Sequence, residues 1–151
     1  MTEPTDHNAE NAAARDRVLS LVSGLTGAQL AAPLDDGWTI GAELVHLAFW
    51  DRVHTARLRA ALESGAALPD PLPAGAADAI NDSGLHAWRR IDGSVAIALF
   101  AEASAEVDAY LATLDAATVD RIRAAGIARH VERFRHRNEH GAVIERGATS
   151  R

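Results

Sequence analysis

The sequence predicts an all-α fold, a four-helix bundle formed by one domain. Three observations support this. The composition is rich in alanine and poor in aromatic residues, which make up 5% of the chain; such a composition favours closely packed helices. Four principal segments carry apolar residues at helical spacing, whereas no strand-like alternation of any length occurs. A long connection separates the middle segments, as in many bundles.

The chain length predicts a single domain over residues 1–151. A chain of 151 residues can bury one core without disulfides, and it has no room for a second. We expect residues 1–7 and 147–151 to be frayed tails.

The first helix is expected from about residue 8 to residue 23. Ala12, Val18 and Val22 recur there at helical spacing, and glycines follow near its end. The stretch "LAAPLDDGW" contains a proline, two aspartates and a glycine, so we interpret it as a connector.

The second helix is predicted to begin after Thr39, a good N-cap residue, and to continue for about 24 residues to near residues 63–65. Its apolar residues cover well over one face, which predicts a buried helix. The stretch "GAALPDPLPAG" holds three of the five prolines and therefore forms a loop.

The remaining pattern predicts three further helical segments. Helical spacing resumes near Ala76 and continues through Trp88, and "IDGS" separates it from a helix over about residues 95–114. The last helix is expected from about Ile127 to Glu145, with Gly147 as its stop.

Composition excludes several classes of function. The chain contains no cysteine, so a disulfide, a thiolate nucleophile or a cysteine metal site cannot form. The sequence shows neither a secretory segment nor a run of 18 apolar residues, and we expect a cytoplasmic protein. The net charge of -6 argues against nucleic-acid binding, although seven arginines against three acids leave residues 121–146 at +4.

Three histidines are candidate metal ligands. His136 and His140 in "FRHRNEHGAV" stand four residues apart. On a helix, this spacing lets both imidazole rings reach one cation. The pair alone also fits a solvated charged face. His46 lies in the apolar stretch "ELVHLAFWD", where its ring needs a partner; it is either a core histidine with one hydrogen bond or a third ligand. Three histidines would leave coordination positions open for water or substrate.

Two segments resemble a known family. "GWTIGAELVHLAFWD" and "HRNEHGAVI" are similar to the second-helix and C-terminal signatures of the DinB/YfiT-like metalloenzyme superfamily, which includes mycothiol-dependent maleylpyruvate isomerases and bacillithiol transferases. The resemblance implies an up-down-down-up four-helix bundle with His46, His136 and His140 as the metal ligands. The isomerase type tends to have Glu where this chain has His136.

The resemblance implies a divalent-metal-dependent enzyme of the small-thiol transferase or isomerase class, with mycothiol as a possible co-substrate. A bound metal ion would lower the pKa of a thiol or water. Zinc is the first expectation, and nickel, iron and manganese also accept such sites. A metal-dependent hydrolase stays open, as does a non-enzymatic binding or stress-response module with a structural or absent metal.

Five charged residues could support this site. Glu43 and Glu132 are spaced to accept a hydrogen bond from a ligand ring, or else they are surface carboxylates. Arg133 and Arg137, with Arg129 nearby, could attract an anionic substrate, or else they form a solvated basic stripe.

Other residues receive weaker predictions. Asp51 could pair with an arginine or help the site. His54 could lie near the same mouth, although an exposed position is the simpler expectation, and the helical position of His130 makes it a poor ligand. The tryptophans are expected in the core or an interface. Relatives often pair through helices, and Gly141 and Ala142 would permit close approach, so we predict a homodimer.

Overall fold

The computed structural model describes residues 6–150, and this part of the chain is all-helical. Its only extended pairing is an isolated antiparallel bridge between Pro33 and Thr39. The elements in chain order are α1 (His7–Val22), α2 (Gly27–Ala31), α3 (Ile40–Ser64), α4 (Ala76–Trp88), α5 (Gly93–Leu111), α6 (Ala116–Ala124), the 3-10 turn η1 (Ala128–His130) and α7 (Arg133–Thr149).

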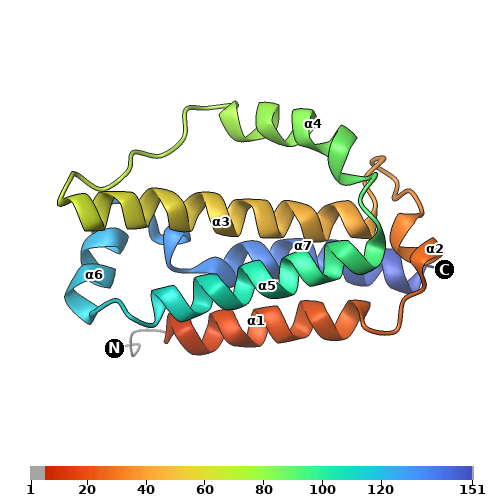
Figure 1. Cartoon of the computed structure of the whole chain (residues 1–151), viewed down its shortest axis with the longest axis horizontal. Coiled ribbons are helices and arrows are strands. Elements are labelled where there is room, and N and C mark those ends of the chain that lie inside the picture. Colours follow the sequence, from red (N-terminus) through yellow and green to blue (C-terminus); the bar gives the residue numbers. More distant parts are fainter. Residues whose placement is uncertain (1–5, 151) are drawn as a thin grey trace.

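Four long helices, α1, α3, α5 and α7, extend along the long axis of the molecule (Figure 1). α3 packs mainly on α5, and α1 packs mainly on α7. α1 and α7 run in one direction and α3 and α5 in the other (Figure 1). Because α3 and α5 are parallel, the chain must return along the whole length of the molecule between them, which explains the long proline-containing connection.

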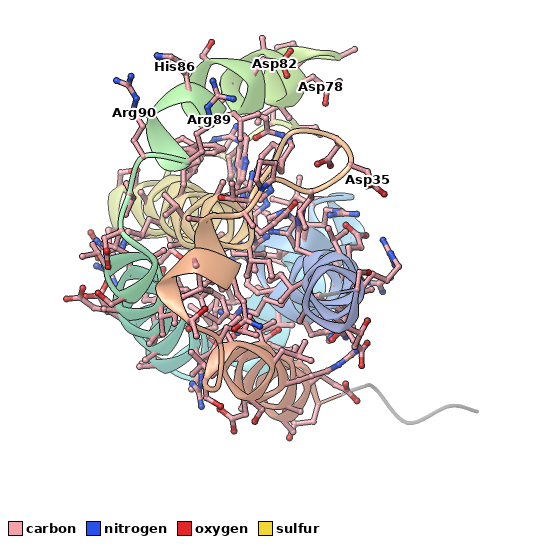
Figure 2. The ribbon with its side chains drawn as sticks, turned by 90° about the vertical axis from the view of Figure 1, so that its right-hand side faces the viewer. Asp35, Asp78, Asp82, His86, Arg89 and Arg90 are labelled. Carbon is pink, nitrogen blue, oxygen red and sulfur yellow. The ribbon has the colours of Figure 1, made fainter. Side chains whose placement is uncertain are left out.

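Helix α4 forms part of this return and lies outside the four long helices, where it contacts α3. Viewed end-on, His86 and Asp82 lie on the outer side of α4, away from the long helices (Figure 2). The inner side carries Trp88, which is buried in the core.

The boundaries of α3 agree with the prediction. The Thr39 side chain accepts a hydrogen bond from the backbone N–H of Ala42 at 3.0 Å, which satisfies an otherwise free donor of the first turn. Gly65 ends the helix with φ of 67°, in the left-handed region that glycine adopts without steric cost. Local sequence therefore determines this helix, which carries His46.

The start of the last helix differs from the prediction. α7 begins at Arg133, and residues 128–130 form a 3-10 turn instead. The Asn11 side chain on α1 donates to the carbonyl of Val131 at 2.8 Å and accepts from the N–H of Phe134 at 2.7 Å. This contact, distant in sequence, fixes the end of the turn and caps the helix.

The predicted tails also differ. His7 lies in α1 and residues 147–149 lie in α7, while residues 1–5 and 151 lie outside the described part. Gly147 does not stop the helix: a Cβ there would approach Leu34 Cδ2 to 2.6 Å and Ile40 Cδ1 to 3.6 Å. The glycine allows α7 to pack closely against the connector.

Two short helices were missed, α2 and α6. α2 is stabilised by a capping box between Thr26 and Gln29, and α6 by the Asp115 side chain, which accepts from the N–H of Thr118. With 5 and 9 residues, these helices are too short for apolar periodicity to identify them reliably.

The buried interior consists of two apolar clusters with a buried ionic group. One cluster contains Leu47 and Phe100, and the other contains Leu58 and Val107. Between these positions along α3 lies Asp51, whose carboxylate is fully buried. Charges this deep require ionic partners, and α7 supplies them.

Within residues 6–150, no helix is both long enough and apolar enough to cross a membrane.

Candidate metal centre

The structure brings together three histidines from two helices that are far apart in sequence. Nε2 of His46, on α3, lies 3.0 Å from Nε2 of His136 and 3.1 Å from Nε2 of His140, both on α7. The three candidate ligand atoms lie within 4.8 Å of one another. The group could hold a divalent metal ion. Two nitrogens bound at ~2.1 Å to one ion lie roughly 3–4 Å apart, and both distances from Nε2 of His46 are of this size.

Glu43 fixes the orientation of the His140 ring. Its Oε2 lies 2.5 Å from Nδ1 of His140. A carboxylate accepts a hydrogen bond, so the proton of a neutral His140 ring is on Nδ1 and the lone pair is on Nε2. Carboxylates position metal-binding histidines in this arrangement. The structure thus places Glu43 against a candidate ligand ring, and its role at a metal site stays a prediction.

Arg133 contacts the back of the His136 ring. Its Nη2 lies 3.1 Å from Nδ1 of His136. A guanidinium only donates, so this contact needs an unprotonated Nδ1, whereas coordination through Nε2 of a neutral ring puts the proton on Nδ1. Metal binding by His136 therefore requires Arg133 to release this hydrogen bond.

The surroundings of His46 and His136 favour neutral rings. Burial, together with His140 and Arg133, lowers the pKa of His46 to about 3. Burial and Arg133 also lower the pKa of His136 strongly. Neutral imidazoles carry the lone pairs that metal coordination needs. Nε2 of His46 lies at hydrogen-bond distance from Nε2 of His136 and of His140, but the rings have too few N–H protons to form a hydrogen bond in each contact. A cation would instead accept one lone pair from each ring.

One cavity of about 510 Å³ is lined by all three histidines. Trp38 and Trp50 contribute aromatic surface, and the loop before α4 contributes Pro71 and Leu72. Asn81 of α4 accepts a hydrogen bond from Nε1 of Trp50 at 2.8 Å. The arrangement combines a group of metal-binding type with an adjacent space for a small molecule.

Arg137 is part of the core and not of the cavity wall. Its side chain is 0% exposed, and its Nη2 donates to Asp51 at 2.9 Å while its Nη1 donates to Asp108 at 2.8 Å. The prediction that Arg137 binds substrate does not fit this position. Burial among carboxylates gives the residue a structural role, which the sequence pattern could not distinguish from a solvated stripe.

Arg133 occupies an intermediate position. It lines the cavity, but its side chain is 1% exposed and its Nε donates to Asp51 at 2.8 Å. Asp51 therefore binds two buried arginines, which agrees with the pairing considered for it. The third candidate cation, Arg129, is exposed at the cavity and pairs with Glu139 at 2.9 Å.

Glu132 forms hydrogen bonds with arginines rather than with a ligand ring. Its two carboxylate oxygens bind Nε of Arg123 at 2.9 Å and Nε of Arg135 at 2.6 Å. The predicted contact with His136 assumed a continuous helix from residue 127. Because α7 begins only at Arg133, the i to i+4 relation is lost.

Sequence reasoning undervalued two other histidines. His54 and His130 both line the cavity, although His54 was expected to be exposed. The sequence signal for this placement was its position eight residues after His46 on the same helix, α3. His130 is outside the three-histidine group, as predicted.

One comparison with known proteins gives a match. A family model described as the DinB superfamily matches residues 10–143. Neither the curated proteins nor the solved structures compared with the chain give a match.

Proposed function

Because the chain belongs to the DinB superfamily, we propose that it is a divalent-metal-dependent enzyme of the small-thiol, mycothiol-type transferase or isomerase class. His46, His136 and His140 would hold the metal, with zinc as the first candidate. The helix directions in Figure 1 support the up-down-down-up bundle that the family resemblance implies.

The observation that carries the proposal is the convergence of three imidazoles on one cavity. Imidazole ligands bring no negative charge, and the single carboxylate of Glu43 would offset only part of the charge of a divalent ion, so an anionic ligand would be favoured beside it. A divalent ion supplies this chemistry by lowering the pKa of a bound thiol. The chain has no cysteine, so the nucleophilic sulfur must belong to a bound small molecule.

The chain's own residues would hold and orient that molecule. Trp38, Trp50 and Leu72 provide apolar surface for its organic part. Arg57 also lines the cavity, and the hydrogen bond given by its guanidinium goes to the backbone carbonyl of Asp70. A cation bound to a carbonyl keeps its charge available to a carboxylate of the substrate.

Metal content tests the site directly. We would purify the native protein, His46→Ala and His140→Ala, load each with zinc, and measure bound metal by elemental analysis. His86→Ala is the matched control, because His86 is exposed on the outer side of α4 (Figure 2). We expect zinc in the native and control proteins and its loss from both site variants with the helical circular dichroism retained. Equal zinc in all four proteins would refute the site.

Activity separates the proposed class from its alternatives. The zinc-loaded protein would be incubated with electrophilic acceptors in the presence and absence of mycothiol, and thiol conjugates or isomerised products would be measured. Turnover that needs the thiol supports the proposal. Acceptor hydrolysis without thiol would instead indicate a hydrolase, and metal binding without any turnover would indicate a binding module.

A further inference from the structure

A second pair of imidazoles lies in the same cavity as the candidate metal ligands. His54, on α3, and His130, in η1, both line it. Their ring centroids are 4.5 Å apart, and their planes are nearly perpendicular at 81°. Neither belongs to the group of three that could hold a metal, so the pair needs a different explanation.

The hydrogen-bonding state of His130 is fixed by the backbone. Its Nδ1 lies 3.2 Å from the carbonyl oxygen of Ile127. A carbonyl only accepts, so the ring proton is on Nδ1 and Nε2 of the neutral ring keeps its lone pair. The residue is 3% exposed, and Nε2 has no hydrogen-bond partner in the described part of the chain. A buried acceptor without a partner is costly and rare in native proteins.

His54 adds a second unsatisfied atom beside it. Nδ1 of His54 is also buried without a partner among the described residues. Two orphan polar atoms, in adjacent rings that line one cavity, mark a place where a polar group of a ligand would be stabilised.

Charge limits which polar group fits. Burial and the neighbouring arginines, Arg133 first among them for His54, lower the pKa of His54 to about 2 and that of His130 to about 4. Arg57 contributes to both shifts. The burial and the nearby positive charges that disfavour a protonated ring also disfavour a ligand ammonium group. The acceptor at Nε2 of His130 therefore suits an uncharged donor.

We propose that His130 and His54 form a polar subsite that binds an uncharged hydrogen-bond donor of the substrate, a hydroxyl or an amide N–H, in the part that does not bind the metal. The inference rests on the proposed function and deepens it, because it adds a second recognition element to a thiol bound at the metal. The cavity would then select thiols that carry a hydroxyl or amide group.

The first test uses the zinc-loaded protein and simple thiols. Binding of ω-mercaptoalcohols would be compared by calorimetry with that of alkanethiols of equal length. We expect the native protein and His86→Phe to prefer the alcohol by roughly threefold to tenfold at the best chain length, the size of one neutral hydrogen bond. His130→Phe should lose the preference, and His130→Gln, which keeps an acceptor, should retain part of it. A preference unchanged in both His130→Phe and His54→Phe would overturn the subsite.

The second test does not depend on the metal. Metal-free native protein would be titrated with butanol and with N-methylacetamide while the imidazole nitrogens are followed by NMR. We expect the Nε2 resonance of His130 to move upfield as it accepts a hydrogen bond, with no such change on adding butane-sized alkanes. An unmoved resonance at saturation would overturn the subsite. Failure of thiols to bind the zinc protein, with this shift present, would count against the proposed function alone.

Discussion

At the scale of single residues, Glu43 has the strongest structural connection to the candidate metal ligands. It lies one helical turn before His46 on α3 and reaches across to His140 on α7 at 2.5 Å. It is 3% exposed, so its charge is poorly screened by solvent. A buried carboxylate in this position serves both to orient one ring and to offset part of the charge of a cation.

Glu43→Gln should weaken metal binding without preventing folding. The amide keeps the shape of the side chain but loses the negative charge that polarises the His140 ring. We expect zinc affinity, measured by competition with a chromophoric chelator, to decrease by about tenfold to a hundredfold. Glu63→Gln, exposed on the same helix, is the control. Equal affinities for the two variants would show that Glu43 does not support the site.

At the scale of elements, Asp51 joins α3 to α7 inside the bundle. Its Oδ1 binds Arg133 and its Oδ2 binds Arg137, at 2.8 and 2.9 Å. Arg137 also binds Asp108 of α5, whose pKa is raised because burial outweighs the arginines. The ion pairs therefore fix the rotation of α7, and with it the direction of the histidines one turn away.

Asp51→Asn should destabilise the protein strongly. The substitution leaves two buried guanidinium groups without a full counter-charge, which costs about 3–5 kcal/mol when a buried pair is broken. Urea unfolding of the metal-free protein would measure the loss. The control is Asp82→Asn on the outer side of α4 (Figure 2), for which we expect a change within about 0.5 kcal/mol. If Asp51→Asn lowered the free energy of unfolding no more than Asp82→Asn does, the structural role of the Asp51 carboxylate would be contradicted.

At the scale of the whole molecule, buried neutral histidines make stability depend on pH. His54 and His130 have folded-state pKa values of about 2 and about 4, against ~6.5 in an unfolded chain. Between pH 6.5 and these lower values the unfolded chain binds more protons than the folded one. Their contribution is therefore complete above pH 6.5 and is lost as the pH falls.

We expect the free energy of unfolding of the metal-free protein to decrease on going from neutral to mildly acidic pH. Each of the two rings should contribute up to about 1.4 kcal/mol per pH unit in that window. His130→Phe should show a smaller pH dependence, whereas His86→Ala should match the native protein. If the free energy of unfolding decreased equally in His130→Phe and in the native protein between neutral and mildly acidic pH, burial of a neutral ring would be contradicted.

The predicted homodimer also belongs to this scale and is carried forward as a proposal. Gly141 cannot supply the interface, because it is buried where a Cβ would meet Val18 of α1 at 3.4 Å. Light scattering should give twice the mass of the chain, and a monomeric mass at micromolar concentration would reject the dimer.

The sequence alone determined the helical class, the extent of α3 and the candidate ligands. Thr39 and Gly65 are local signals that act on the backbone next to them, so their outcome does not depend on the rest of the fold. The i to i+4 spacing of His136 and His140 is likewise a property of any helix. His46 was conspicuous because an imidazole in an apolar stretch needs a partner.

Only the tertiary structure decided which charged residues belong to the site. Asn11 on α1 terminates η1 and caps α7, which removed the register that had placed Glu132 beside His136. Asp51, 86 residues before Arg137, turned a predicted substrate contact into a core ion pair. These outcomes depend on contacts between segments that are distant in sequence. Such contacts outweigh the local conformational preferences from which the sequence predictions were made.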